Sequence, residues 1–561
     1  MPSLLPPPPP SSSPTMSLPM LVEELLREQQ ALSAVEQFSQ YHATTTPAQE
    51  RYYHSLLPSS PPGPGEQYAF EVDLDCCSGC KACVTACHSL NGLGESETFR
   101  DVGLLIGGTS SLPVLQHVTS ACHHCVEPAC QTVCPTLAYQ KDAVTGIVKH
   151  LDDQCFGCQY CILACPYEVP QYNAKKGIVR KCDMCSSRLK AGEAPACVQA
   201  CPHQAIAIRL VKTADVAADC EANSFLPGAP DPQLTLPTTN YKTAKSFPRN
   251  MLPVDYYAAH AAHAHPPLVA MLVLTQLSVG ALWIRAALPL TGLPVVEHLE
   301  PLQAISALLF GLVALGAATL HLGRPHLAYR AVLGLRKSWL SREIVAFGVF
   351  AGLASLEAGR TWLQPQMLAA PDWLGWSVLV SGFVGVFCSV MIYHCTRRST
   401  WIGPRTFLRF FGSTVWLGLS TTLLVAAIVA GLRADLSIGS VLHDLGAVLC
   451  PALMLVAALK LTYEACDLLH LLERQHTPLK RAANLLVGEL AGMTAARFTL
   501  GVLGGLVFPA VLWHEASSSH SLEWMSTVVA VWLFSVAGET LERALFFMAA
   551  AAPRMPGGLK T

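Results

Sequence analysis

The sequence has little charge for its length. Only 14% of its 561 residues are charged, and 51% are hydrophobic, whereas a soluble domain carries about 25% charge. This deficit excludes a disordered chain and argues against a purely soluble one. The 37 basic and 39 acidic residues give a net charge of -2. The sequence therefore lacks the basic excess of a nucleic-acid binder, and we expect no nucleic-acid partner.

Several functional signals are missing as well. The first residues contain no basic stretch followed by an apolar one and no twin arginine, so we expect no export signal. No nucleotide-binding loop or nucleophile triad is evident. We therefore expect no substrate-converting site in this chain.

Residues 1–66 predict a tail rather than a domain. The segment 1–15 is mostly proline and serine, which cannot form a packed core, and 58–66 is a proline-rich linker. Between them, apolar residues recur at helical spacing and predict one amphipathic helix. This helix either packs on its own domain or docks a partner. The apolar positions are Leu21, Leu25, Leu32, Val35 and Phe38.

Cysteine, in contrast, is abundant in one region. Eighteen of the 22 cysteines lie between Cys76 and Cys220, and sixteen of them form four runs. The ferredoxin run is C-x2-C-x2-C-x3-C-P; the third run matches it fully, and the first lacks only the proline. The runs are Cys77-x2-Cys80-x2-Cys83-x3-Cys87, Cys122-x2-Cys125-x4-Cys130-x3-Cys134-Pro135, Cys155-x2-Cys158-x2-Cys161-x3-Cys165-Pro166 and Cys182-x2-Cys185-x11-Cys197-x3-Cys201-Pro202.

This spacing predicts four [4Fe–4S] clusters. Two-residue gaps let one loop hold three corners of a cubane, and the last cysteine of the run ligates the neighbouring cluster. Such crossed ligation requires the runs to pair, and we pair the first with the fourth and the second with the third. The predicted ligand sets are group 1 (Cys77, Cys80, Cys83, Cys201), group 2 (Cys122, Cys125, Cys130, Cys165), group 3 (Cys155, Cys158, Cys161, Cys134) and group 4 (Cys182, Cys185, Cys197, Cys87).

The alternatives for these cysteines fit less well. Structural zinc uses separated C-x2-C pairs, and a disulfide framework requires secretion. No ligand is missing at Cys158, so we expect no [3Fe–4S] centre. Cys76 and Cys220 are spare thiols, and His123 and His124 would tune potentials by hydrogen bonding.

The second half predicts a membrane domain of eight helices. Its apolar stretches each approach or exceed the roughly 20 residues that cross a bilayer, and tryptophans fall near several of their ends. The predicted spans are 267–288, 302–322, 344–363, 373–394, 411–432, 444–465, 491–513 and 524–547.

An even number of spans places both ends of this half on one side, together with the cysteine domain. The loops on that side carry 12 basic residues, and the loops on the other side carry 3. The positive-inside rule therefore predicts an inner-membrane protein whose cysteine domain faces the cytoplasm.

Ionisable groups within a membrane are costly and often functional. Here they gather on the cysteine side, where His321, Glu343, Glu539 and Arg543 predict a quinone site. Each one alone could equally be a paired or snorkelling residue at a helix end. Haem is a competing use of the histidines, but His321 and His394 lie at one face and His443 and His514 at the other. We therefore expect no haem.

The cysteine half resembles the electron-transfer subunit of the dimethyl sulfoxide reductase family. The matching stretches are ACHHCVEPACQTVCP, DDQCFGCQYCILACPYEVPQYN, KCDMC and APACVQACP, within about residues 68–210. The resemblance implies four [4Fe–4S] clusters and a separate molybdopterin catalytic subunit as the partner.

The membrane half resembles the haem-free anchor subunit of the same family. The matching residues are His321-Leu322-Gly323-Arg324-Pro325, Ser341-Arg342-Glu343-Ile344, and Gly538-Glu539 with Arg543. The resemblance associates His321 with menaquinol and adds Arg324 to the quinol site. The chain is thus similar to a fusion of both subunits. Its inferred orientation resembles that of cytoplasm-facing sulfite:quinone oxidoreductases, in which electrons flow the opposite way.

The prediction is therefore an α+β ferredoxin-like domain of two paired dicluster units, followed by an all-α membrane domain. We expect a tail at 1–66, the cluster domain at 67–212, an extended linker at 213–264, the anchor at 265–550 and a second tail at 551–561. We expect it to pass electrons between menaquinol or ubiquinol and the catalytic subunit. A transporter or scaffold with a sensing cluster domain is the rival of another class.

Overall fold

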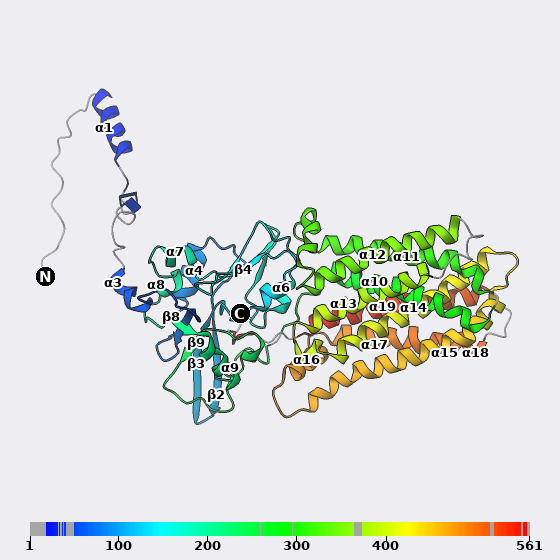
Figure 1. Cartoon of the computed structure of the whole chain (residues 1–561). Coiled ribbons are helices and arrows are strands. Elements are labelled where there is room, and N and C mark those ends of the chain that lie inside the picture. The colour runs from blue at the N-terminus through cyan, green and yellow to red at the C-terminus, as the bar shows by residue number, and fades with distance from the viewer. Residues whose placement is uncertain are drawn as a thin grey trace.

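The computed structural model describes most of the protein. The described residues are 18–31, 33, 36–37, 39–40, 50–258, 260–293, 295–363, 373–515, 521–550 and 554–557. The predicted Pro/Ser tract at 1–15, the helix positions Leu32, Val35 and Phe38, and most of the 551–561 tail lie outside these residues. Figure 1 shows an α/β part beside a bundle of long helices, which confirms the predicted two-part architecture.

Strand pairing explains how the first and fourth cysteine runs meet. Strand β1 (Glu66–Asp73) ends just before the first run, and β8 (Ile206–Lys212) begins just after the fourth. The two strands pair antiparallel from Glu66 opposite Lys212 to Val72 opposite Ile206. The pairing encloses the second and third runs between two outer ones, as two nested ferredoxin-like units require.

The remaining strands are short or form a hairpin. Strands β2 (Asp101–Thr109) and β3 (Leu112–Ser120) form an antiparallel hairpin. The pairs β4 (Tyr139–Lys141) with β5 (Val148–His150) and β6 (Gln171–Asn173) with β7 (Ile178–Arg180) complete the domain. The helices between them are α4 (Ala82–Leu90), α5 (Ala129–Thr132), α6 (Tyr160–Ala164), α7 (Ser186–Lys190) and α8 (Ala196–Gln199).

The segment predicted as an extended linker is instead packed on the cluster domain over much of its length. It begins with helix α9 (Thr213–Glu221) and includes β9 (Asn240–Lys242), which pairs parallel with β1. Strand β10 (Leu252–Pro253) pairs with β2. Its prolines suggested an extended segment, but the sequence did not reveal the sheet edges that this segment covers.

The membrane half contains eight helices, among the described residues, that are long and apolar enough to cross a bilayer, as predicted. The seventh is continuous through a π-helical turn at Leu503–Val507. The helices are α10 (Pro266–Ala287), α11 (Val296–Leu320), α12 (Trp339–Leu363), α13 (Trp373–His394), α14 (Pro404–Leu432), α15 (Ile438–Ala465), α17 (Ala491–Val502) with α18 (Phe508–Glu515), and α19 (Ser521–Met548).

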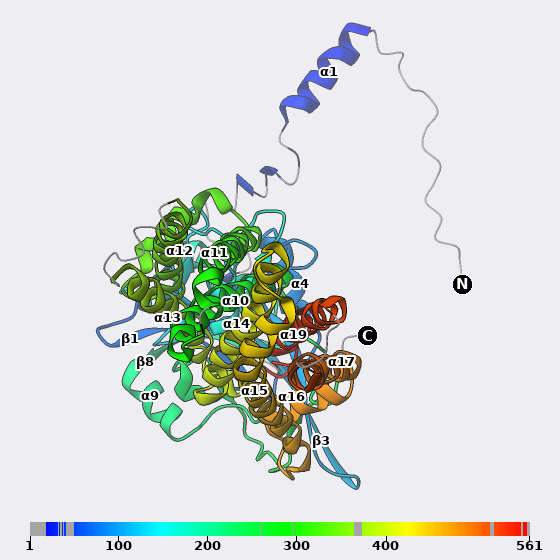
Figure 2. The same ribbon diagram turned by 90° about the vertical axis from the view of Figure 1, so that its right-hand side faces the viewer.

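Two helices form the centre of the bundle. In the apolar stretch of each helix, 67% of the residues are buried in α10 and 72% in α14, but only 28% are buried in α11. Helices α10 and α14 also lie in the middle when the bundle is viewed end-on (Figure 2). Gly280 and Gly418 face each other where they cross; a Cβ on Gly280 would lie 1.9 Å from the Thr414 carbonyl oxygen. Glycine therefore permits the close approach of these two helices.

Helix α1 (Leu18–Gln30) stands away from the rest of the molecule (Figures 1 and 2). Its apolar side chains, including Leu18, Leu21 and Leu25, are exposed. In the described residues Leu18–Gln30, this amphipathic helix therefore does not pack on the cluster domain.

Candidate functional site: a series of cysteine groups that ends at an apolar cavity

Each predicted ligand set is brought together from two different runs. In group 1, the pKa of Cys77 is raised first by burial and then by three nearby thiols, those of Cys83, Cys201 and Cys80. In group 3, burial and the neighbouring Cys158, Cys134 and Cys155 thiols raise the pKa of Cys161.

Groups 2 and 4 have the same arrangement. All four cysteines of group 2 line one cavity of about 20 Å³, together with His123, His124 and Lys181. In group 4, burial and the Cys197 and Cys185 thiols raise the pKa of Cys87 to about 12. Thiols packed this closely repel one another as thiolates, so a cationic centre is needed to hold them deprotonated.

The local backbone fits iron–sulfur cluster binding. Backbone N–H groups donate to cysteine sulfurs from Ala138 to Cys134 at 3.2 Å and from Ala205 to Cys201 at 3.3 Å. Such hydrogen bonds tune the potential of a cluster. No three His, Cys, Asp or Glu side chains in the described part of the protein are arranged to hold a single metal ion.

Two buried cations lie between the cysteine groups. Burial lowers the pKa of Lys181, but the thiolates of Cys122, Cys130 and Cys182 outweigh it and raise the pKa. Lys181 donates to Cys122 Sγ at 3.5 Å. It therefore lies between groups 2 and 4. Lys181 directly precedes Cys182 but was not among the predicted site residues.

Arg100 is the second buried cation. Burial again lowers its pKa, and the thiolates of Cys197 and Cys83 reverse the shift, so Arg100 lies between groups 4 and 1. At the other end, the buried Tyr139 is near Cys161 of group 3 and Cys130 of group 2, whose thiolates, after burial, raise its pKa. The groups therefore follow one another in the order 1, 4, 2, 3.

Group 3 lies where the cluster domain meets the membrane helices. Gly157, between Cys155 and Cys158, has φ +75°, and a Cβ there would lie 2.4 Å from the Gly177 carbonyl oxygen and 3.0 Å from Gly323. The Arg324 backbone N–H donates to the Phe156 carbonyl at 3.0 Å. The sequence His321–Pro325 is therefore part of the junction between the two halves.

Arg324 serves this junction directly. Its guanidinium donates to the backbone carbonyls of Asp152 at 3.0 Å and Lys176 at 3.2 Å. Farther along the junction, Arg398 Nε donates to the Leu163 carbonyl at 2.9 Å. The predicted quinol ligand Arg324 thus binds the cluster domain in this structure.

Beside the junction is a cavity of about 340 Å³. His321 and Glu343, both predicted for the quinol site, lie on its wall with Cys158 of group 3. Burial lowers the pKa of His321, and a hydrogen bond with the Cys158 backbone partly offsets this effect. The Ser389 hydroxyl donates to Glu343 Oε1. The other lining residues are Phe156, Gln159, Tyr160, Ile162, Leu163, His265, Leu268, Met271, Leu315, Ala318, Thr319, Leu322, Ala328, Leu340, Ile344, Phe347, Gly348, Ile392 and Tyr393.

The cavity suits a large apolar molecule with polar ends. Ligand pockets of 300–1,000 Å³ are mostly apolar with a few placed polar groups, as is the case here. Five polar residues of its wall were not predicted from the sequence, namely Gln159, Tyr160, His265, Thr319 and Tyr393. The Tyr160 hydroxyl donates across the junction to the Ile392 carbonyl at 2.8 Å.

Glu539 and Arg543, the other two predicted quinol residues, do not line this cavity. They belong to a buried ion network that joins α14, α15, α17 and α19. Glu539 accepts hydrogen bonds from Lys460 at 2.8 Å and from Arg497 at 2.8 Å, and also from Ser413. Arg543 donates to Ser413 Oγ at 3.1 Å.

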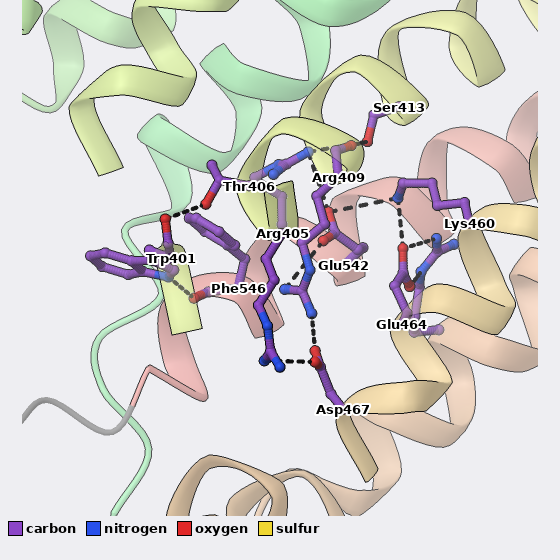
Figure 3. Close-up of polar contacts among 12 residues, drawn as sticks. Trp401, Arg405, Thr406, Arg409, Ser413, Lys460, Glu464, Asp467, Glu542 and Phe546 are labelled. Carbon is purple, nitrogen blue, oxygen red and sulfur yellow. Dashed lines mark hydrogen bonds and ion pairs between the residues drawn. The ribbon is translucent and has the colours of Figure 1, made fainter. Parts of the chain in front are cut away.

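The same ion network continues toward the surface on the side of the cluster domain. Figure 3 shows Arg405 and Arg409 directed at Asp467, and Lys460 directed at Glu464. Arg497 also pairs with Glu464 at 3.0 Å, and a cavity of about 60 Å³ lies among these side chains. The network pairs nearly all of its charges with opposite charges.

The fold and site define a class of protein: an iron–sulfur electron-transfer domain joined to a multi-pass membrane anchor. The 4Fe-4S dicluster domain family matches residues 114–210, and the DMSO reductase anchor subunit family (DmsC) matches 260–548, just over half of the sequence. The protein therefore belongs to the DMSO reductase anchor subunit family, and its two matches are consistent with a fusion of the B and C subunits of such a reductase.

Relatives of the cysteine half include subunits of dimethyl sulfoxide and thiosulfate reductases. The B subunit of the anaerobic dimethyl sulfoxide reductase of Haemophilus influenzae is 42% identical over 150 residues, which cover 25% of the present sequence and 73% of that subunit. The corresponding B subunit of Escherichia coli is 38% identical over 148 residues, covering 25% and 72%. The thiosulfate reductase electron transfer subunit PhsB of Salmonella typhi is 39% identical over 143 residues, covering 25% and 74%.

Proposed function

We propose that this protein oxidises a quinol in the cavity beside His321 and passes the electrons to a separate molybdopterin catalytic subunit. Oxidation of a quinol releases two protons and two electrons, so it requires a proton acceptor and an electron acceptor at the same pocket. The observation that carries the proposal is the shared wall, on which His321 and Glu343 meet Cys158 of group 3. The reductase subunits among the relatives support the catalytic partner.

The four cysteine groups are proposed to hold one [4Fe–4S] cluster each, with the ligand sets given above. Each such cluster accepts and donates one electron. The order of the groups suggests a path that starts at the quinol cavity with group 3 and continues through groups 2, 4 and 1. Lys181 and Arg100 lie between successive groups, where their charges stabilise thiolates.

Within the quinol site, the residues divide into three roles. His321 and Glu343 face the quinol, which is menaquinol or ubiquinol. Arg324 holds the loop of group 3 against the membrane half through Asp152 and Lys176. Glu539 and Arg543, in the adjacent ion network, hold the helices together and do not contact the quinol.

We place the protein in the inner membrane with the cluster domain in the cytoplasm. The support is the excess of basic residues in the loops on that side. A reporter fused after Thr561 is expected to be active only as a cytoplasmic fusion. Activity of a periplasmic reporter at that position would contradict this orientation.

His321→Leu tests the proposed quinol site. In membranes prepared without oxygen, reduction of the iron–sulfur absorbance by added quinol is expected to fall at least about 100-fold. Reduction by dithionite is expected to stay complete, because His321 belongs to none of the four cysteine groups. His326→Leu is the matched control, because His326 is exposed in the same loop and does not line the cavity. Unchanged quinol kinetics in His321→Leu would overturn the proposal.

A further inference from the structure

A second histidine shares the cavity wall with His321. The His265 ring packs edge-to-face against the His321 ring, with 5.2 Å between centroids. His265 is half-buried, at the point where the segment before α10 reaches the cavity. The His263 ring follows at 4.8 Å and is exposed. The His265 side chain thus extends from the quinol cavity toward the solvent on the cluster side.

The backbone at His265 is held in an unusual conformation. Its φ is +50°, in the left-handed region that costs energy for a residue other than glycine. Two prolines, Pro266 and Pro267, follow and start helix α10. The backbone N–H of His265 donates to the ring nitrogen Nδ1 of His263 at 3.0 Å. This bond secures the turn that places the His265 ring beside His321.

We propose that His265 accepts the quinol proton and releases it to the solvent on the cluster side, and that His263 is the residue that positions it. This inference rests on the proposed function of the cavity.

The proton and electron balance of this step is simple. Each quinol O–H bond breaks, and its proton forms an N–H bond with a His265 ring nitrogen, directly or through His321. The two electrons leave one at a time toward the iron–sulfur cluster assigned to group 3, and the quinol becomes a quinone. The proton passes from His265 to water before the second one is accepted, so two protons and two electrons leave for each quinol.

The surroundings of His265 favour a neutral, proton-accepting ring. Burial, and after it the His321 and His263 rings, lower the pKa of His265 to about 4. Helix α19 presents the uncharged Phe547 ring, 5.9 Å from the His265 ring. Glu343, Tyr160, Tyr393 and Cys158 are the titratable groups on the other walls of the cavity. A neutral imidazole accepts a proton and, with a low pKa, returns it readily to water.

His265→Ala tests the proton acceptor in the whole complex. The rate of quinol-driven iron–sulfur reduction is expected to fall about 100-fold, within the usual range for loss of an acid–base group. Reduction by dithionite is expected to be unchanged. Added imidazole should restore the rate, because His265 is partly open to solvent. This restored rate should decrease when the pH is lowered below about 6.5, because imidazole then becomes protonated.

His260→Ala is the matched control for this experiment. His260 lies in the same segment, is exposed and pairs with Glu489 at 3.7 Å, outside the cavity. Its loss is expected to leave the rate unchanged. A His265→Ala variant with the normal rate, or a slow variant that imidazole does not restore, would overturn the inference.

His263 requires a different pair of variants, since its role is to accept a hydrogen bond. His263→Asn retains an acceptor oxygen and is expected to keep most of the rate. His263→Leu removes the acceptor and is expected to slow the reaction about tenfold. The pH at which the rate declines on the acid side is expected to stay the same. Equal rates in both variants would show that His263 does not position His265.

The failure of this inference is separable from the failure of the proposed function. If His321→Leu abolishes quinol oxidation while His265→Ala does not, the cavity binds quinol and His265 is not the acceptor. If neither variant has an effect, the quinol site itself is elsewhere. Both results overturn the inference, and only the second overturns the proposed function.

Discussion

Two cavities on the cluster side of the membrane domain have opposite chemistry. The cavity beside His321 is about 340 Å³, with apolar walls and a few separate ionisable groups. The cavity beside Arg409 is about 60 Å³ and is lined by arginines and carboxylates that pair with one another. The first has room for a ligand, whereas the second has room for little more than water.

The comparison teaches how to interpret ionisable residues in a membrane. Such residues are costly wherever they occur, so their presence alone suggests function. Their partners separate the roles. Glu343 has a serine partner and faces an open apolar space, whereas Glu539 has two cations and a serine as partners. The first arrangement suits exchange with a ligand, and the second suits a structural role between helices.

Among the variants that test this comparison, Lys460→Met is expected to have the largest effect. Lys460 Nζ lies 2.8 Å from Glu464, 2.8 Å from Glu539 and 3.9 Å from Glu542. Without it, three buried carboxylates lose a shared cation, and a broken buried pair costs about 3–5 kcal/mol. The free energy of unfolding in detergent, measured by denaturant titration, should fall by that amount.

Arg433→Met is the control for Lys460→Met. Arg433 is exposed and lies 3.9 Å from Asp435, so its loss is expected to change the free energy of unfolding by less than about 1 kcal/mol. Equal effects of the two variants would contradict a structural role for the ion network.

A matched pair of glutamate variants gives the next largest effects. Glu343→Gln is expected to slow quinol-driven reduction about 100-fold and to leave the unfolding midpoint nearly unchanged. Glu539→Gln is expected to lower the free energy of unfolding by about 3 kcal/mol with a near-normal rate in the folded fraction. The two measurements are made on the same preparations. If both variants lose activity equally without loss of stability, Glu539 belongs to the quinol site after all.

The architecture follows from the sequence because its signals are local. Tight spacing within each cysteine run and long apolar stretches need no tertiary information, and the structure confirms the ferredoxin-like fold and the eight helices. The pairing of the outer runs was also predictable, since crossed ligation requires the runs to pair. The segment 213–264 was misinterpreted because its strands form only against β1 and β2.

The membrane site was harder to predict, because side chains from distant helices meet there. The positions of His321 and Glu343 in the predicted spans placed them correctly at the cluster side of the membrane. The same criterion also selected Glu539, whose partners Lys460 and Arg497 come from other helices. His265 was overlooked because it lies two residues before the first predicted span, 267–288. Its importance depends on a turn that only the structure reveals.

Iron and acid-labile sulfide content of the full-length protein, purified without oxygen, tests the central claim most directly. Four cubanes held by sixteen cysteines predict about 16 iron and about 16 sulfide per molecule. Stoichiometric zinc, or a protein free of iron and sulfide, would contradict the account, because the cavity beside His321 would then have no electron acceptor at its wall.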